Sequence, residues 1–444
     1  MDTFFQFGES GDRMRRKIYK CALSLVLMGA MVTIMALGYK NVYEKIPGRI
    51  RLKAGVEQIL DLNVPVEGVI TKNAESPGAV TVSGKQSSNI PSDAIYIDLS
   101  GVVTLKADTI ENYRMDLKLF GFIPFKQVDI EVIQDMMVTP VGEPIGIYVK
   151  TEGLLVIGVG EFDDAGGRKQ SPAKYLLKTG DYILKVNDES VSEKEDFMEV
   201  IEDSEGEKIA LTIRRDDKEF NVNVEPVKNM DGEYKLGIWV RDNAQGVGTM
   251  TFVDDLGNFG ALGHGISDVD TGTLLTLESG SLYKTEIIAI QKGKNGEPGE
   301  MTGMIEYANR NILGEITANT SKGIYGTCNA KIMSDLKQKA MPIGLKQDVK
   351  EGKAQILCNV DGEAKYYDVL IKDIYLEHEN VNRGMLLKIT DPQLLAITGG
   401  IIQGMSGAPI IQDGKLIGAV THVLVQDSTS GYGIFVENML NHSN

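Results

Sequence analysis

Residues 399–420 place two apolar runs around a single serine, and this stretch constrains the fold more than any other part of the chain. The first run ends in Gly404-Met405-Ser406-Gly407, and the second begins at Pro409-Ile410-Ile411. Glycines on both sides of the serine allow backbone conformations that a β-carbon forbids. Asp413-Gly414 then predicts a hairpin turn before a further apolar strand. The serine is therefore expected on a tight turn between β-strands.

This turn has the features that a nucleophilic serine needs. The backbone N–H groups of Gly404 and Ser406 can point into one hollow, which is how an oxyanion hole forms. The spacing also resembles the G-x-S-x-G elbow of α/β-hydrolases, but Ala408 replaces the last glycine and a strand follows where that elbow needs a helix. The alternative is a structural glycine turn between core strands.

A serine hydroxyl becomes nucleophilic when a base takes its proton, and histidine is the usual base. His264 lies between Gly263 and Gly265, which leave room for a ligand, although a loop histidine is often an incidental surface residue. His422 is a competing candidate on an apolar strand, where a structural role is the alternative. Asp391 is a candidate to orient the imidazole, and its alternative role is that of a turn residue before proline.

Charge and cysteine content exclude some classes of function. The net charge of −16 argues against nucleic-acid binding. Cys21 lies in the N-terminal apolar stretch, while Cys328 and Cys358 can either pair or stay free. The sequence has no C-x-x-C motif and no cysteine–histidine cluster at ligand spacing, so we expect neither a metal site nor a cofactor.

The N-terminus predicts a membrane segment. An uncharged apolar stretch from Cys21 to Leu37 follows a basic cluster, which is formed by Arg13, Arg15, Arg16, Lys17 and Lys20. Its length is near the lower limit for a spanning helix, and the preceding positive charge predicts a cytoplasmic N-terminus. We therefore predict a cytoplasmic segment at 1–20 and a transmembrane signal anchor at 21–39. The alternatives are a cleavable signal peptide and a buried helix of a soluble domain.

Three further regions follow in the chain, and the fold expected for the whole is mostly β (α+β). Residues 48–135 alternate short apolar runs with turn residues, which predicts a small β-rich membrane-proximal domain. Residues 138–228 contain a strand pair, a Ser171-Pro172 helix start and a Gly180-Asp181 hairpin, and this order resembles a PDZ domain of the bacterial protease type. Residues 235–444 are short strands between glycine turns, which suits a double β-barrel.

The PDZ resemblance implies a peptide-binding site. In that family, the loop that here carries Ile145, Gly146 and Ile147 receives a peptide carboxylate or an internal strand, which extends the sheet at its edge. The alternative is a PDZ domain that serves only as an intramolecular clamp, because fold does not settle function.

The serine and histidine segments carry a more specific resemblance. Residues 404–409 resemble the GDSGGP motif of chymotrypsin-like serine proteases, and 261–265 look like their histidine segment. More closely, the chain resembles the stage IV sporulation protein B family of serine peptidases, through 261–272 and 398–423. The resemblance implies a catalytic set with its oxyanion hole, formed by His264 as base, Ser406 as nucleophile, Asp391 as orienting acid, and the amides of Gly404 and Ser406. In chymotrypsin-like proteases the aspartate lies much farther from the serine, so the role of Asp391 depends on the narrower family.

The same resemblance implies a signalling protease. Members of the family cross the inner forespore membrane, act in the space between the two forespore membranes, and cleave themselves in trans. They also cleave a regulatory subunit of a membrane metalloprotease complex and so release processing of a late sigma factor. Expected partners are thus the protein substrate, a second copy of the chain, and the membrane through the N-terminal helix. The alternatives are a PDZ scaffold with a dead protease fold and an envelope quality-control protease, in which the PDZ domain usually follows the protease.

Overall fold

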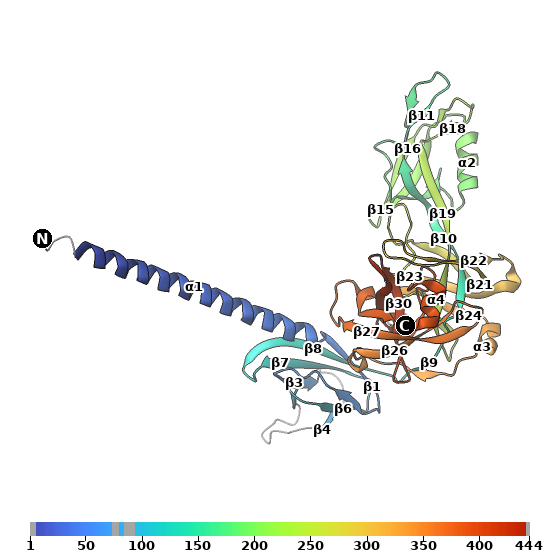
Figure 1. Ribbon diagram of the computed structural model, residues 1–444. Helices are drawn as coiled ribbons and strands as arrows, with labels where there is room; N and C mark the ends of the chain where they lie inside the picture. Colours follow the sequence, from blue (N-terminus) through green and yellow to red (C-terminus); the bar gives the residue numbers. More distant parts are fainter. Residues whose placement is uncertain (1–5, 73–79, 84–93, 441–444) are drawn as a thin grey trace. The chain divides into compact units, whose positions relative to one another are not determined.

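The computed structural model describes residues 6–72, 80–83 and 94–440, which belong to two compact units, Met1–Asp135 and Met136–Asn444 (Figure 1). The first five residues of the predicted cytoplasmic segment lie outside the described residues. Most described elements are β-strands, and a long N-terminal helix precedes them. The expected mostly β fold class is confirmed.

The first unit begins with helix α1 (Gln6–Lys45), which is longer than the predicted span. Its segment Tyr19–Lys45 has a mean hydropathy of 2.2, and none of the most apolar part is buried in the protein. Leu25 and Leu37, for example, expose 68% and 63% of their surface. Apolar side chains in such number need an apolar environment outside the protein, so α1 fits either a membrane anchor or a signal sequence.

Two small sheets follow α1 and share one hydrophobic core. Strand order is β1-β8-β7-β3-β5 in the larger sheet and β2-β6-β4 in the smaller one. Along β7, Tyr113, Met115 and Leu117 are buried while their neighbours are exposed, which is the period-two pattern of a half-buried strand. The strands are β1 (Arg49–Lys53), β2 (Gln58–Leu60), β3 (Val66–Lys72), β4 (Val80–Ser83), β5 (Ala94–Asp98), β6 (Val103–Ala107), β7 (Asn112–Leu119) and β8 (Ile123–Ile133).

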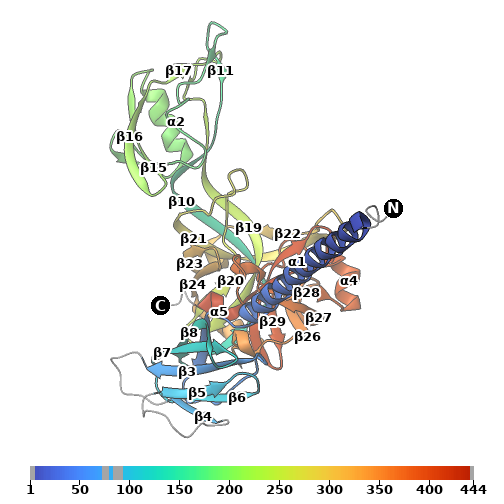
Figure 2. The ribbon, with the colours of Figure 1, turned by 90° about the vertical axis from the view of Figure 1, so that its left-hand side faces the viewer.

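The second unit contains a PDZ-like part built on one helix. Phe197 and Ile201 lie four residues apart on α2, so they share one face, and both are buried against strand residues such as Leu211. Figure 2 shows α2 lying across β15 and β16. The elements are β11 (Phe162–Asp163), β12 (Lys169–Gln170), β13 (Tyr182–Val186), β14 (Glu189–Ser190), α2 (Lys194–Asp203), β15 (Ile209–Arg215), β16 (Lys218–Val224), β17 (Val227–Lys228) and β18 (Tyr234–Lys235).

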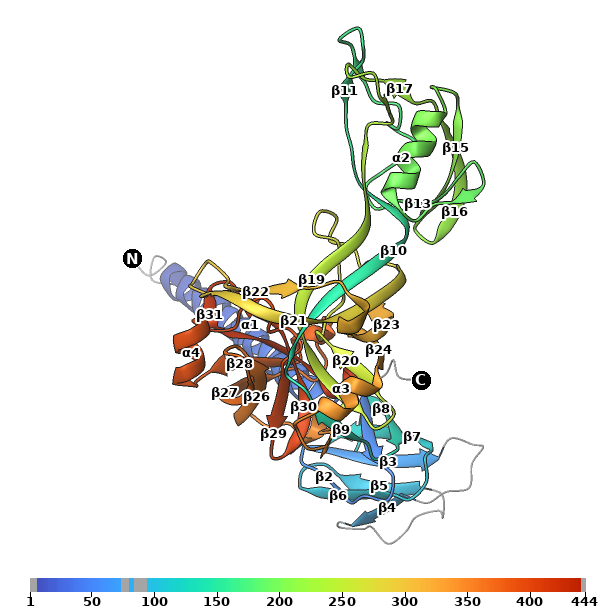
Figure 3. The ribbon, with the colours of Figure 1, turned by 90° about the vertical axis from the view of Figure 1, so that its right-hand side faces the viewer.

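Two long strands connect this part to the rest of the unit. Strands β10 (Pro144–Val159) and β19 (Ile238–Asp254) pair antiparallel along most of their length, with β-bulges between, and form the ribbon visible in Figure 3. The first half of β10 also pairs with β21, and its second half pairs with β13. The PDZ part is thus inserted between two strands of the neighbouring barrel. The ribbon thus belongs to both parts, and the boundaries at 138–228 and 235–444 stay sequence predictions.

The remaining strands form two barrels, as expected for a double β-barrel. In the first, pairing runs in a closed cycle through β10, β21, β23, β24, β20 and β19. The other elements of this part of the unit are β9 (Met137–Pro140), β20 (Asn258–Ala261), β21 (Leu277–Gln291), β22 (Glu300–Ile305), β23 (Ile312–Thr320), β24 (Gly323–Cys328) and the helix α3 (Ala330–Asp335).

The second barrel closes in the order β26-β27-β28-β31-β30-β29 around its own core. Each barrel buries the inward-facing residues of its strands, so each provides a rigid support for the turns at its ends. The elements are β25 (Met341–Pro342), β26 (Gly352–Asn359), β27 (Ala364–Ile374), β28 (Met385–Ile389), α4 (Pro392–Thr398), β29 (Pro409–Gln412), β30 (Lys415–Leu424), β31 (Asp427–Phe435) and α5 (Val436–Met439).

Replacing Phe197 tests how the PDZ core is held. We expect Phe197→Ala to lower the free energy of unfolding of this part by about 3 to 5 kcal/mol, because the change leaves a cavity under α2. Trp239 is the only tryptophan of the chain and lies beside Gly160 at the PDZ end of β19, so its fluorescence during urea unfolding provides the measurement. Met198→Ala is the matched control, because Met198 is 56% exposed. Equal unfolding curves for the two variants would contradict this account of the core.

Candidate active site

The turn that carries Ser406 is held by β19. The N–H of Thr249 donates to the carbonyl of Ser406 (2.9 Å), and the Thr249 hydroxyl donates to the carbonyl of Gly404 (2.7 Å). Two residues further along the strand, the Thr251 hydroxyl donates to the carbonyl of Gly407 (2.8 Å). Gly407 has a φ of +98°, and a β-carbon there would lie 2.0 Å from the carbonyl oxygen of Thr249. Only glycine therefore fits between the serine and β19.

The turn that carries His264 is held by the same strand. The N–H of Leu262 donates to the carbonyl of Thr249 (3.2 Å) as the chain leaves β20. Leu262 and Gly263 then adopt φ values of +67° and +69°. A positive φ is unfavourable for leucine, and such strain persists only where surrounding contacts impose it. Thr249 thus joins the histidine turn to the serine turn.

Ser406 and His264 line one cavity of about 470 Å³. Its wall also includes Gly404 and a group of apolar side chains, namely Ile147, Val247, Leu262, Ile266, Ile401, Ile402, Val423 and Val425. A larger cavity of about 970 Å³ lies elsewhere in the unit and contains neither candidate residue, so size alone does not locate the chemistry. The structure therefore brings together the serine and the histidine that the sequence predicted.

The two polar groups make hydrogen bonds to backbone carbonyls. Ser406 Oγ donates to the carbonyl of Thr421 (2.7 Å), and His264 Nδ1 lies 2.9 Å from the carbonyl oxygen of Gly265. A carbonyl only accepts, so Nδ1 carries the hydrogen and Nε2 of the neutral ring has the free lone pair. No hydrogen bond joins Ser406 to His264 among the described residues. Such bonds are often absent from ligand-free active sites and form when substrate binds.

Two N–H groups beside the serine are free to bind an oxyanion. Neither the amide of Gly404 nor that of Ser406 has an acceptor within the part of the chain that the structure describes. Neighbouring amides are engaged, since Met405 N–H donates to Ile402 and Gly407 N–H donates to Val420. Gly404 has a φ of +96°, a conformation that favours glycine. These two N–H groups are the donors that the sequence predicts for an oxyanion hole.

The surroundings keep both nearby histidines neutral. Burial lowers the pKa of His264 below its ordinary value of 6.5. The hydrogen bond with the Gly265 carbonyl raises this pKa, but by less than burial lowers it. The ring centroid of His422 lies 5.1 Å from that of His264. Desolvation by burial is the main cause that lowers the pKa of His422 to about 4, and the nearby charges of His264 and then Arg383 make smaller contributions to the same shift. At neutral pH His264 is thus in the form that accepts a proton.

Asp391 lies away from this cavity. Its carboxylate caps α4 by accepting hydrogen bonds from the N–H groups of Gln393 (2.9 Å) and Leu394 (3.0 Å). Asp391 is not among the residues that line the cavity, and its described contacts do not include His264. Proline at the first helical position and an acidic cap form a common helix start. The orienting role of Asp391 thus stays a sequence prediction that no contact here supports.

The predicted peptide-binding residues are also placed differently. Ile145, Gly146 and Ile147 lie within β10, where each pairs with β19 on one side and with β21 on the other. A strand that is paired on both edges cannot accept an added peptide strand. The sequence motif suggested a free PDZ edge, but the ribbon continues straight into the first barrel. Ile147 instead lines the cavity that contains Ser406.

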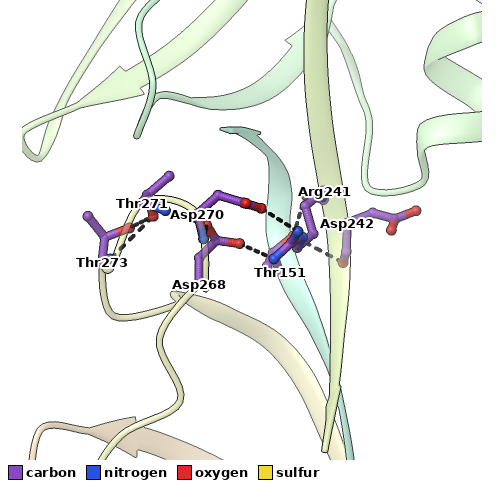
Figure 4. Close-up of polar contacts among 7 residues, drawn as sticks. All are labelled: Thr151, Arg241, Asp242, Asp268, Asp270, Thr271 and Thr273. Atoms are coloured by element: carbon purple, nitrogen blue, oxygen red, sulfur yellow. Dashed lines mark hydrogen bonds and ion pairs between the residues drawn. The ribbon is translucent and has the colours of Figure 1, made fainter. Parts of the chain in front are cut away.

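A small hairpin follows His264 and is tied to the ribbon by an ion cluster (Figure 4). Leu275 N–H donates to the carbonyl of Ile266 (3.0 Å), which closes the base of this hairpin, residues 266–275. Near its tip, Arg241 of β19 donates to the carboxylates of Asp268 (2.5 Å) and Asp270 (2.6 Å). The Asp268 side chain is fully buried, so the arginine compensates a charge that is shielded from water.

The ion cluster lies where the ribbon passes from the barrel to the PDZ part. The hydroxyl of Thr151 donates to the carbonyl of Gly153 (2.6 Å) at the bulge of β10, and it also lies 3.0 Å from the carbonyl oxygen of Asp242. At the hairpin tip, the Asp268 carboxylate also accepts the N–H groups of Asp270 and Thr271. These bonds hold the ribbon and the hairpin tip in shape, and the Arg241 ion pairs fix the hairpin relative to β19.

Sequence reasoning missed the residues that hold the site together. Thr249 and Thr251 lie two apart on a strand, a spacing that equally fits any β-strand facing solvent or core. Arg241 and Asp268 contact each other 27 residues apart, and no local pattern marks such a pair. The cysteines stay free: burial raises the pKa of Cys328 to about 12, and Cys358 lies fully inside the second barrel. Among the described residues, no group of histidine, cysteine and acidic side chains could hold a metal ion.

Comparisons with known proteins support a peptidase domain and a PDZ domain in this chain. Residues 232–440 match the family described as SpoIVB peptidase S55, and residues 152–225 match the PDZ domain family. The resemblance predicted from the serine and histidine segments is confirmed. No curated protein matches the chain at a significant level.

Two solved structures are similar to parts of the chain. The PDZ domain of the SdrC-like protein from Listeria monocytogenes is 21% identical, with a TM-score of 0.18, over 21% of this chain and 90% of that chain. The HtrA-type protease AlgW, solved with a decapeptide, is 9% identical, with a TM-score of 0.27, over 68% of this chain. The match spans 63% of that protease.

Gly407 tests the packing of the serine turn. We expect Gly407→Ala to slow labelling by a fluorophosphonate probe by at least about 100-fold, because the new β-carbon displaces Ser406 from β19. Gly414→Ala is the matched control, since Gly414 also has a positive φ but no atom within 4 Å of the position of its β-carbon. The control should lose about 1 kcal/mol of stability and keep its labelling rate. Normal labelling of Gly407→Ala would contradict the packing described.

The pH dependence of labelling tests the protonation state of His264. A general base acts in its neutral form, so the rate falls as the pH drops through the pKa of His264. Since that pKa is lowered, we expect the midpoint of the fall below pH 6.5. A midpoint above this value would mean that a carboxylate stabilises the imidazolium, contrary to the contacts seen here.

Asp391 can be tested by a substitution that keeps its cap. Asparagine caps helices as well as aspartate, so we expect Asp391→Asn to label within about threefold of the wild type. Asp391→Ala should lose about 1 kcal/mol of stability through the missing cap. A loss of about 10⁴-fold in the folded asparagine variant would instead establish Asp391 as the orienting acid.

Proposed function

We propose that this chain, which carries a SpoIVB-type S55 peptidase domain together with a PDZ domain, is a serine endopeptidase with Ser406 as nucleophile and His264 as general base. One observation carries the proposal: Ser406, His264 and two free amide donors meet at a single cavity. The family match of residues 232–440 supports the reaction class independently.

The proposed steps of the reaction are built on these contacts. The Ser406 hydroxyl leaves the carbonyl of Thr421 and attacks the scissile carbonyl carbon, while Nε2 of His264 takes its proton. The carbonyl oxygen becomes an oxyanion and accepts hydrogen bonds from the amides of Gly404 and Ser406. Nε2 returns the proton to the leaving amine, and water then hydrolyses the acyl-enzyme by the same two steps. The Gly265 carbonyl keeps the imidazole in the productive tautomer throughout.

The cavity wall favours peptides with apolar side chains. Ile147, Leu262 and Ile401 contribute apolar side chains to it from three separate segments, beside polar lining residues such as Gln245 and Gln403. An apolar pocket binds aliphatic side chains through the area that they bury. We therefore propose a preference for an aliphatic residue next to the cleaved bond.

The proposed setting is the signalling step implied by the family. The enzyme is held in the membrane or secreted by way of α1, acts outside the cytoplasm in the forespore intermembrane space, and cleaves itself in trans. Its substrate is the regulatory subunit of a membrane metalloprotease complex, and cleavage triggers late sigma-factor processing. The SpoIVB family match, the PDZ domain and the apolar α1 support this proposal.

Ser406→Ala tests the proposed activity. We expect the wild type to react with a fluorophosphonate probe and to fragment over time, and the variant to do neither. Ser279→Ala, which changes an exposed serine on β21, is the control and should behave like the wild type. Identical behaviour of the folded wild type and Ser406→Ala would favour the PDZ scaffold with a dead protease fold.

A further inference from the structure

The side chain of Asn319 holds the base of the hairpin that follows His264. Asn319 lies near the end of β23, where its backbone pairs with Ile324 of β24. Its Oδ1 accepts the N–H of Ile266 (2.8 Å), and its Nδ2 donates to the carbonyls of Ile266 (2.9 Å) and Leu275 (2.9 Å). Ile266 and Leu275 are 53 and 44 positions away from Asn319 in the chain. One amide thus binds both strands of the hairpin.

One peptide group lies between Asn319 and the catalytic histidine. The N–H of Ile266, which binds Asn319, and the carbonyl of Gly265, which binds His264 Nδ1, belong to the same peptide bond. A peptide group is planar, so fixing its N–H also fixes the direction of its carbonyl. Hydrogen bonds in such a chain also polarise one another.

We propose that Asn319 is a positioning residue that orients His264 through the peptide group joining Gly265 and Ile266. This inference rests on the proposed roles of Ser406 and His264. In many serine peptidases a carboxylate binds the histidine directly and sets its tautomer. Here the Gly265 carbonyl occupies that place, and the Asn319 amide keeps this carbonyl in position.

The packing around the peptide group leaves it little freedom. A β-carbon on Gly265 would lie 2.2 Å from Leu274 and 2.5 Å from the carbonyl oxygen of Thr320, so the backbone rests directly on the end of β23. Contact of this kind excludes water and permits a single arrangement. Asn319 and Thr320 are consecutive residues, and they therefore form one platform under the histidine turn.

An amide is the group that this site requires. Asn319 uses one acceptor and two donor positions, which matches one N–H and two carbonyls. A carboxylate has no donor, so an aspartate here would place an oxygen against the carbonyl oxygens of Ile266 and Leu275. The repulsion would displace the hairpin and, with it, the Gly265 carbonyl.

Fluorophosphonate labelling of the full-length protein in detergent tests the inference. The rate is measured against probe concentration, which separates the maximal rate from the concentration that gives half of it. We expect Asn319→Asp to lower the maximal rate by about 100-fold and to leave the half-saturating concentration unchanged, because His264 is misplaced while the cavity persists. Asn319→Ala adds no charge and should lower the maximal rate by at least about tenfold, which keeps the test available if the aspartate variant does not fold.

Asn329→Asp is the matched control, because it makes the same change in the same barrel. Asn329 caps α3 through Ile332 and donates to the carbonyl of Ile312, away from the hairpin. It should label at the wild-type rate. Labelling of both Asn319 variants within threefold of the wild type, or an equal loss in Asn329→Asp, would overturn the inference. Labelling of Ser406→Ala at the wild-type rate would overturn the proposed function itself.

Discussion

The candidate active site depends on one residue of β19 that binds two turns at once. The N–H and hydroxyl of Thr249 hold the serine turn, and its carbonyl holds the chain that leads to His264. Catalysis by a serine and a histidine tolerates errors of only about 0.5 Å in their relative position. The two residues come from different barrels, 142 positions apart in the chain, so a direct link between their turns is needed. Backbone hydrogen bonds to a paired strand provide it.

The same strand also carries the other supports of the site. Arg241 of β19 binds the tip of the hairpin after His264, and residues 244–247 line the cavity. At its other end β19 pairs with β10 inside the PDZ part, beside α2. One continuous strand therefore contacts the PDZ core, the histidine hairpin and the serine turn. Asn319 of β23 completes this arrangement at the base of the hairpin.

The sequence predicted those features that depend on local pattern. Glycines around Ser406 and His264 mark turns that require positive φ, and alternation of apolar residues marks the strands of both barrels. Peptide binding at Ile145, Gly146 and Ile147 stays a prediction that the pairing of β10 on both edges does not support, because a PDZ-like motif does not show that its strand continues into a second domain. Asp391 illustrates a further limit, since a helix cap and an orienting acid have the same sequence signature before proline. Asn319 left no signal, because its partners are distant in the chain.

The most direct test of the central claim is a crystal structure of the full-length protein after reaction with a fluorophosphonate. The account predicts a bond from Ser406 Oγ to phosphorus, with the phosphonyl oxygen within 2.7–3.1 Å of the amides of Gly404 and Ser406. It also predicts Nε2 of His264 facing Oγ, and Nδ1 still bound to the Gly265 carbonyl. An adduct on another residue, or a phosphonyl oxygen turned away from both amides, would contradict the claim that these groups form one catalytic site.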